Sequence, residues 1–133
     1  MGEEKQNLIV DLSYAFAVNA IKYVEILEAK RKFNLANQLF RSATSVGANI
    51  RESQSAESRA DFIHKLKIAA KEAEETQYWL KLCGDIESYP NPGELLNQII
   101  SISKVLSKII GTSKSLIINE KKSVYKSANK AIN

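Results

Sequence analysis

Hydrophobic side chains recur at every third or fourth position along most of the chain, which is the spacing of one face of an α-helix. Four such stripes predict helices over about residues 7–30, 35–53, 58–84 and 92–112. No alternation of the kind that marks a strand competes with them. The stripes contain Ile9, Leu12, Phe16, Ala20, Tyr23 and Leu27, then Leu35, Leu39, Val46 and Ile50, then Phe62, Leu66, Ala69, Ala73, Thr76, Leu80 and Cys83, and finally Leu95, Ile99, Ile102, Leu106 and Ile109.

The connections between these helices are short and carry helix-start signals. Asn34 can cap the second helix, Ser58 with Asp61 resembles a capping box, and Asn91 precedes the fourth helix beside the chain's two prolines. Short links place consecutive helices side by side, so we expect an all-α fold: an antiparallel up-down-up-down four-helix bundle over residues 1–116. Residues 117–133 form a lysine-rich tail that either extends the last helix or is mobile.

The composition excludes several common classes of catalytic and metal-binding function. The 133 residues suit one domain, and a single cysteine and a single histidine exclude an internal disulfide, a Cys/His zinc cluster and the common histidine-based triads. We expect no catalytic residue, no metal site, no cofactor and no small-molecule substrate. A secretion signal and a membrane span are both missing from the pattern, so a cytoplasmic protein without membrane contact is expected.

Charge is distributed unevenly along the chain. Residues 1–95 carry 12 Lys and Arg against 14 Asp and Glu, whereas residues 96–133 carry seven Lys and one Glu. The net charge of +4 therefore comes from the last third, where the basic residues suit either a solubilising terminus or a contact with a polyanion.

The second predicted helix has a polar stripe beside its apolar one. Gln38, Ser42, Ser45, Asn49 and Glu52 follow each other at steps of four and three. Gly47 lies in the same helix, where glycine costs about 1 kcal/mol relative to alanine. We expect close approach of a neighbouring helix at Gly47 to compensate.

The middle of the chain resembles a known family. The segment from Gln38 to Glu52 reads QLFRSATSVGANIRE and is similar to the QLxRSxxSIxANIxE pattern of the 23S rRNA intervening-sequence proteins, with Val46 in place of Ile. A second pattern of that family is met at Asp61, Phe62, Leu66, Ala69, Glu72, Glu75, Trp79 and Leu80. The resemblance extends over about residues 7–115.

The resemblance implies a four-helix bundle that assembles into a ring-like homo-oligomer, pentameric in related structures, with no established enzymatic activity. Genes of this family often lie inside insertions of bacterial large-subunit ribosomal RNA. A related bundle is the accessory protein of diversity-generating retroelements, where it partners a reverse transcriptase and nucleic acid. Both relatives imply a scaffold associated with RNA or a nucleoprotein, and neither assigns a catalytic residue.

Two interpretations of the polar residues remain open. In the structural one, they set the register of the bundle or of an assembly, and Arg41 pairs with Glu72 or Glu75 across two antiparallel helices. The structural set is Gln38, Arg41, Ser42, Ser45, Asn49, Glu52, Asp61, Glu72, Glu75 and Trp79. In the functional one, basic residues reach phosphates from one surface, and the candidates are Arg41, Arg51, Lys65, Lys71, Lys121, Lys122 and Lys126.

The sequence therefore predicts a non-enzymatic, self-associating helical scaffold that binds RNA or a nucleoprotein. The alternative is a protein–protein interaction module without direct nucleic-acid binding. Salt-sensitive RNA binding would favour the first, and an exposed apolar patch without a continuous basic stripe would favour the second.

Overall fold

The fold was examined in a computed structural model, which describes residues 2–132 and the side chains of residues 8–131. Throughout this part of the chain the regular structure is helical: α1 (Gly2–Ala29), α2 (Phe33–Ser53), α3 (Arg59–Asp85) and α4 (Leu95–Ile132). The predicted all-α fold with four helices is confirmed. Among the described residues, none of these helices is long and apolar enough to cross a membrane.

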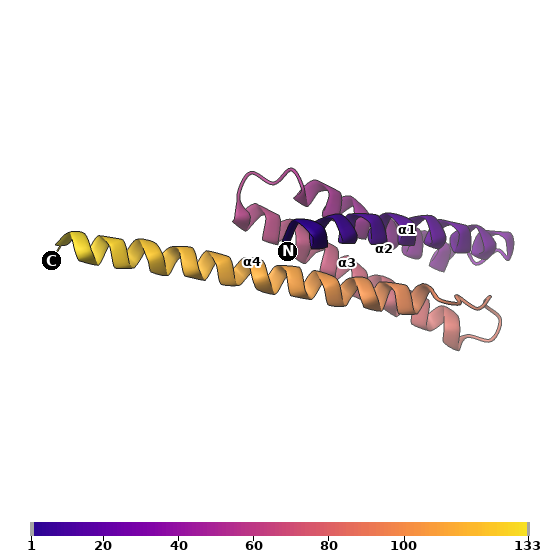
Figure 1. Ribbon diagram of the computed structural model, residues 1–133. Coiled ribbons are helices and arrows are strands. Elements are labelled where there is room, and N and C mark those ends of the chain that lie inside the picture. Colours follow the sequence, from indigo (N-terminus) through magenta and orange to yellow (C-terminus); the bar gives the residue numbers. More distant parts are fainter. Residues whose placement is uncertain (1, 133) are drawn as a thin grey trace.

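The helices form a bundle in which each packs on two others. α1 lies against α2 and α4, and α3 lies against the same two helices. Figure 1 shows the α1–α2 and α3–α4 connections at one end of the bundle and the α2–α3 connection at the other. The C-terminal part of α4 projects beyond the ends of the other helices (Figure 1).

The core is built from the predicted apolar stripes. Its largest fully buried side chains come from all four helices: Ile9, Phe16, Leu27, Leu39, Val46, Ile50, Leu66, Leu80, Ile99, Ile102 and Leu106. Leu12 was expected among them, but it is 37% exposed. It lines a pocket between α1 and α4 beside Phe16 and Ile102, at the edge of the core, because this position is turned toward the boundary of the two helices.

The connection between α1 and α2 differs from the prediction. Arg31 has φ of 63°, its N–H bonds to the carbonyl of Glu28 at 2.8 Å, and the N–H of Lys32 bonds to the carbonyl of Leu27 at 2.8 Å. These are the two bonds of a Schellman motif, which ends a helix with one left-handed residue. α2 therefore begins at Phe33, with Lys32 in the cap position. The expectation that Asn34 caps α2 is wrong, because Asn34 already lies inside the helix.

The start of α3 follows the predicted signal. The N–H of Asp61 donates to Oγ of Ser58 at 3.0 Å, and the Asp61 carboxylate accepts from the N–H of Glu57 at 3.3 Å. Ser58 thus satisfies a backbone donor that the first turn of a helix leaves open, and Asp61 binds the backbone N–H of the residue before the cap.

The start of α4 lies three residues later than expected. The Asn91 side chain accepts from the N–H of Gly93 at 2.8 Å, and Gly93 has φ of 61°. The side chain therefore stabilises a turn that glycine accommodates, and α4 begins at Leu95 instead of at residue 92.

α1 approaches α2 closely at Gly47. A Cβ atom at this position would lie 3.4 Å from the carbonyl oxygen of Ser13. The expectation of close helix approach at Gly47 is confirmed, and α1 is the helix that approaches.

α4 is much longer than the helices around it. Its 38 residues span about 57 Å at 1.5 Å per residue. The Gln77 amide donates to Oγ of Ser103 at 2.9 Å, and Arg59 pairs with Glu120 at 3.1 Å. Gln77 and Arg59 lie 18 residues apart on α3, and their partners Ser103 and Glu120 lie 17 residues apart on α4. The two helices therefore stay in register up to Glu120. α3 begins at Arg59, so residues 121–131, called the arm below, pass its end.

Candidate functional site

Arg41 joins α2 to α3 through two carboxylates. Its Nη1 lies 3.2 Å from Oε2 of Glu72, and its Nη2 bonds to Oε1 of Glu75. The indole N–H of Trp79 donates to the same Glu75 oxygen at 3.3 Å. The predicted pairing of Arg41 with these carboxylates is therefore present, and Trp79 takes part in it through a hydrogen bond.

A buried hydroxyl pair lies beside this cluster. Oγ1 of Thr76 is 2.9 Å from Oγ of Ser42 and 2.8 Å from the carbonyl of Glu72. Both hydroxyl side chains are fully buried between α2 and α3. Buried hydroxyls without partners are costly, so this pair fixes how the two helices face each other.

Ser45 and Asn49 of the polar stripe bond within their own helix. The Ser45 hydroxyl donates to the carbonyl of Arg41 at 2.7 Å, and the Asn49 amide donates to the carbonyl of Ser45 at 2.9 Å. Gln38 is exposed on the same stripe. These side chains therefore support α2 itself and do not bridge it to α3.

A second ion pair links α2 to α3 near the helix ends. Nζ of Lys65 lies 3.2 Å from Oε2 of Glu52, in a pair that is half exposed. Exposed pairs of this kind contribute about 0–1 kcal/mol. Together with the Asp61 cap, this pair places Glu52 and Asp61 in structural contacts.

The four basic candidates on the bundle divide between two helix boundaries and the outer surface of α3. Arg41 and Lys65 are held in ion pairs at the α2–α3 boundary. Arg51 lines a pocket between α1 and α2. Lys71 is exposed on α3, one residue and about 100° around the helix from Glu72. These four residues therefore form no single phosphate-binding face within one chain.

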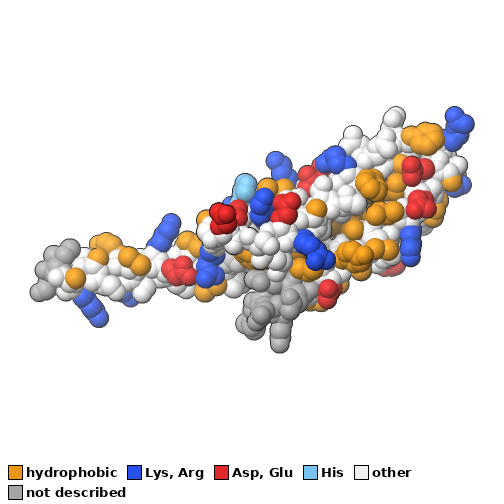
Figure 2. Space-filling model, turned by 90° about the horizontal axis from the view of Figure 1, so that it is seen from above, with side chains coloured by type: hydrophobic (Ala, Val, Ile, Leu, Met, Phe, Trp, Pro, Cys, Tyr) orange, Lys and Arg blue, Asp and Glu red, His pale blue; other side chains and the backbone are white. Residues whose placement is uncertain are grey.

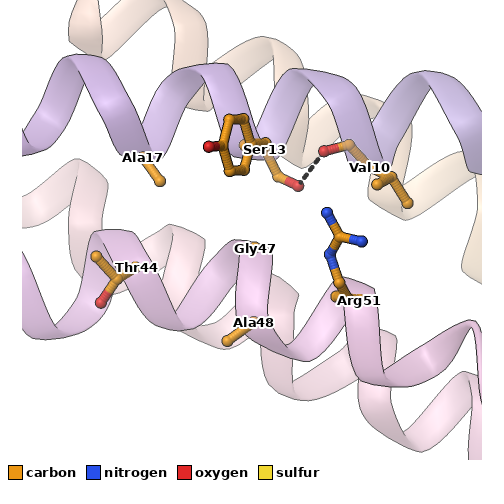
Figure 3. A pocket seen from close by; sticks show the side chains of 8 residues that line it. Val10, Ser13, Ala17, Thr44, Gly47, Ala48 and Arg51 are labelled. Carbon is orange, nitrogen blue, oxygen red and sulfur yellow. Dashed lines mark hydrogen bonds between the residues drawn. The ribbon is translucent and has the colours of Figure 1, made fainter.

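The α1–α2 pocket is mostly apolar and has a volume of about 320 Å³. It is lined by Val10, Ser13, Tyr14, Ala17, Thr44, Gly47, Ala48 and Arg51. Figure 3 shows the small side chains Ala17 and Ala48 around Gly47 and the Arg51 guanidinium reaching from α2 toward α1. The Ser13 hydroxyl donates to the carbonyl of Val10 at 3.1 Å, so it is already bonded inside α1.

Large hydrophobic side chains are exposed on α1 and α2, of which Tyr14 lines this pocket and Leu12 lines the α1–α4 pocket. Figure 2, which views the molecule from above Figure 1, shows hydrophobic side chains gathered over one face of the bundle. The exposed members on the two helices are Leu8, Leu12, Tyr14, Val18, Ile26, Phe33 and Phe40. Apolar surface of this kind is typical of a face that another molecule covers.

Tyr23 and Cys83 form a buried pair of titratable groups. The Tyr23 hydroxyl donates to the carbonyl of Pro90 at 2.5 Å, which anchors the α3–α4 connection to α1. Burial and the neighbouring Cys83 raise the pKa of Tyr23, and burial raises the pKa of the Cys83 thiol. Both groups therefore stay protonated at neutral pH and act as packing groups.

The arm carries the remaining basic candidates. Lys121, Lys122 and Lys126 are exposed there, together with Lys130. Figure 2 shows lysine side chains standing out along this projecting helix. The carboxylate closest along the chain, Glu120, is paired with Arg59. The arm thus carries four exposed lysines and no carboxylate of its own.

The fold and these contacts define a class of protein: a four-helix bundle whose middle polar residues tie α2 to α3, with large hydrophobic side chains exposed on α1 and α2 and lysines exposed at the end of α4. The family profile described as 23S rRNA-intervening sequence protein matches residues 5–108. The chain belongs to this family. Its arm lies beyond the matched residues.

A solved structure supports the same assignment. The chain is similar to a protein of unknown function from the S23 ribosomal protein family of Bacteroides thetaiotaomicron VPI-5482, with 44% sequence identity and a TM-score of 0.76. The similarity covers 80% of this chain and 98% of that one. A search of curated proteins gave no match.

Several contacts at the α2–α3 boundary were not predicted from the sequence. Thr76 was assigned to the apolar stripe, and its bond to Ser42 was missed, as was the pair of Lys65 with Glu52. The position of Arg41 opposite Glu75 indicates both contacts. Antiparallel helices that pair these two residues must also place Ser42 near Thr76 and Glu52 near Lys65. One predicted contact thus fixes the register of the others.

Proposed function

We propose that this protein is a non-enzymatic, oligomeric helical-bundle scaffold that associates with RNA or an RNA-containing partner. The observation that carries the proposal is a division among its cations. Arg41 and Lys65 are engaged by carboxylates at the α2–α3 boundary, whereas the four lysines at the end of α4 are exposed and have no carboxylate among residues 121–131. Exposed lysines concentrated on one element are a typical electrostatic footprint for nucleic acid. Membership of the 23S rRNA-intervening sequence protein family supports the same partner.

The proposed assembly is a ring-like homo-oligomer of up-down-up-down bundles, with five copies as the expected number. The exposed hydrophobic side chains of α1 and α2 support self-association, since covering them with a second copy removes apolar surface from water. A ring repeats each weak RNA contact in every subunit, so avidity strengthens binding. The proposal places this assembly in the cytoplasm and assigns it no catalytic residue, cofactor or metal.

RNA binding is tested by fluorescence anisotropy with a labelled 20-nucleotide single-stranded RNA at 50 and 200 mM NaCl. We expect binding that weakens about 20-fold over this range for three phosphate contacts, because binding releases counterions. A protein that fails to bind at 50 mM salt, or whose affinity ignores salt, would contradict the RNA part of the proposal.

The second candidate is a protein–protein interaction module, and the α1–α2 pocket, which the exposed Tyr14 lines, is the observation that favours it. The two candidates differ in one outcome. An oligomer that ignores RNA at low salt, but whose α1–α2 face is protected from hydrogen exchange by a protein partner, would support the second.

A further inference from the structure

The last third of the chain concentrates positive charge on one helix. Between residues 96 and 133 there are seven lysines and a single carboxylate, Glu120. That carboxylate lies 3.1 Å from Arg59 of α3, so α3 already engages it. The lysines after Glu120 therefore have no acidic neighbour within the arm itself.

Four polar side chains of the arm share one face of α4. Ser123, Lys126, Ser127 and Lys130 stand at positions i, i+3, i+4 and i+7, which are neighbours on a helix surface. With Asn129 they line a shallow hollow in the arm. Two ammonium groups and two hydroxyls offer several hydrogen-bond donors to one anion.

Lys122 extends this face by one turn. Lys122, Lys126 and Lys130 follow each other at four-residue steps, so the row rises about 6 Å per lysine and about 12 Å in all. Like charges at this spacing repel each other and weaken a helix. A chain of phosphates laid along the row removes that repulsion, whereas a single small anion reaches only part of it.

The arm is poorly suited to packing against another protein. Val124 and Tyr125 are its large hydrophobic residues, 70% and 68% exposed, and the other positions of 121–131 are Lys, Ser, Asn and Ala. A helix–helix seam needs large apolar residues repeated over several turns. Charge and composition both favour a polyanion over a protein as the partner of the arm.

We infer that the arm is the phosphate-binding element of the protein, in which Lys122, Lys126 and Lys130, with the hydroxyls of Ser123 and Ser127, contact the backbone of a nucleic-acid strand without reading its bases. The inference rests on the proposed function and assigns its RNA contact to a segment beyond the family match at residues 5–108. RNA and DNA share this phosphate chemistry, so both are probes in the test.

The test compares three full-length variants by anisotropy with a 20-nucleotide oligo-uridine RNA and a DNA strand of equal length. The first is K122Q/K126Q/K130Q, the second is the conservative K122R/K126R/K130R, and the control is K22Q/K67Q/K81Q, which removes the same charge from exposed lysines of the bundle. Glutamine keeps good helix propensity, so circular dichroism should show all variants folded.

Loss of three phosphate contacts per arm is expected to weaken RNA binding about 100-fold at 0.1 M salt and to lower the slope of log affinity against log salt by about 2. The arginine variant and the bundle control should stay within about threefold of the unmodified protein. DNA should bind within about tenfold of RNA, because the contact is to phosphate. Adding RNA should slow hydrogen exchange over residues 121–131, since binding relieves the lysine repulsion.

Four results would overturn the inference. If the unmodified protein binds RNA and K122Q/K126Q/K130Q binds equally well, the arm is not the contact and the proposed function stands. Equal losses in the control would assign the effect to net charge alone. A preference for RNA over DNA well beyond tenfold would refute a contact limited to phosphate. Failure of the unmodified protein to bind either strand at 50 mM salt would refute the proposed RNA association together with the inference.

Discussion

The buried Ser42–Thr76 pair gives a sharp test of the α2–α3 boundary. In a Thr76→Val variant the side-chain shape is kept and the hydroxyl is lost, so no cavity forms. Oγ of Ser42 then keeps only its 3.5 Å contact with the carbonyl of Leu39, which is too long for a good hydrogen bond. Because Ser42 is fully buried, we expect the free energy of unfolding to fall by about 1–3 kcal/mol.

The partner variant should cost less. In Ser42→Ala, Thr76 keeps its 2.8 Å bond to the carbonyl of Glu72, so no hydroxyl is left without a partner. The double variant removes both hydroxyls and should be about as stable as Ser42→Ala alone, so the coupling energy should equal the Thr76→Val loss of about 1–3 kcal/mol. Thr44→Val is the matched control, since Thr44 bonds only to carbonyls of its own helix and its loss should cost less than about 0.5 kcal/mol.

The assay is urea unfolding followed by circular dichroism at 25 °C, at one fixed protein concentration because assembly shifts apparent stability. A neutral Thr76→Val, or a double variant whose loss equals the sum of the single losses, would refute the argument that this pair fixes the boundary between α2 and α3.

Three further predictions follow from other contacts. Arg41→Met should lower the free energy of unfolding by about 1–2 kcal/mol, and a double-mutant cycle with Glu75→Gln should recover about 0.5–1 kcal/mol of it as coupling, less in 1 M salt; purely additive losses would show that the pair contributes nothing. Gly47→Ala should stabilise the protein by up to about 1 kcal/mol, because a Cβ fits at 3.4 Å from α1, whereas Gly47→Leu should destabilise it by about 1–3 kcal/mol through overpacking; equal melting temperatures and masses for all three proteins would contradict this. Stability should fall as pH rises above about 9, because the unfolded chain releases the Cys83 and Tyr23 protons that burial retains in the folded chain; unfolding titrations at pH 8 and 10.5 should show a smaller fall in Cys83→Ala, and an identical fall would exclude the thiol as a source.

The helices could be predicted because the apolar spacing is regular and the breaks carry chemistry. Ser58 with Asp61 marked the start of α3 correctly. The start of α2 was misplaced because a Schellman turn needs a left-handed residue, and Arg31 takes that role where glycine is the usual signal. The end of α4 could not be predicted, because the residue pattern of 117–133 fits both a helix without packing partners and a mobile tail.

The candidate site could be predicted as far as one salt bridge. Arg41, Glu72 and Glu75 were paired from their positions on antiparallel helices. Whether Arg51 and Lys65 shared a surface with Arg41 could not be predicted, because that depends on which neighbour each face of α2 meets. Lys65 of α3 meets Glu52 of α2 at the same boundary as Arg41, whereas Arg51 faces α1.

Light scattering of the protein, alone and with a 20-nucleotide RNA, tests the proposed scaffold most directly. The account predicts a mass that is a multiple of the 14.9 kDa chain, five copies being expected. We also expect the mass to rise further when RNA is added at 50 mM salt, and this rise to disappear at high salt. A mass of 14.9 kDa that RNA leaves unchanged would contradict both the assembly and its proposed partner.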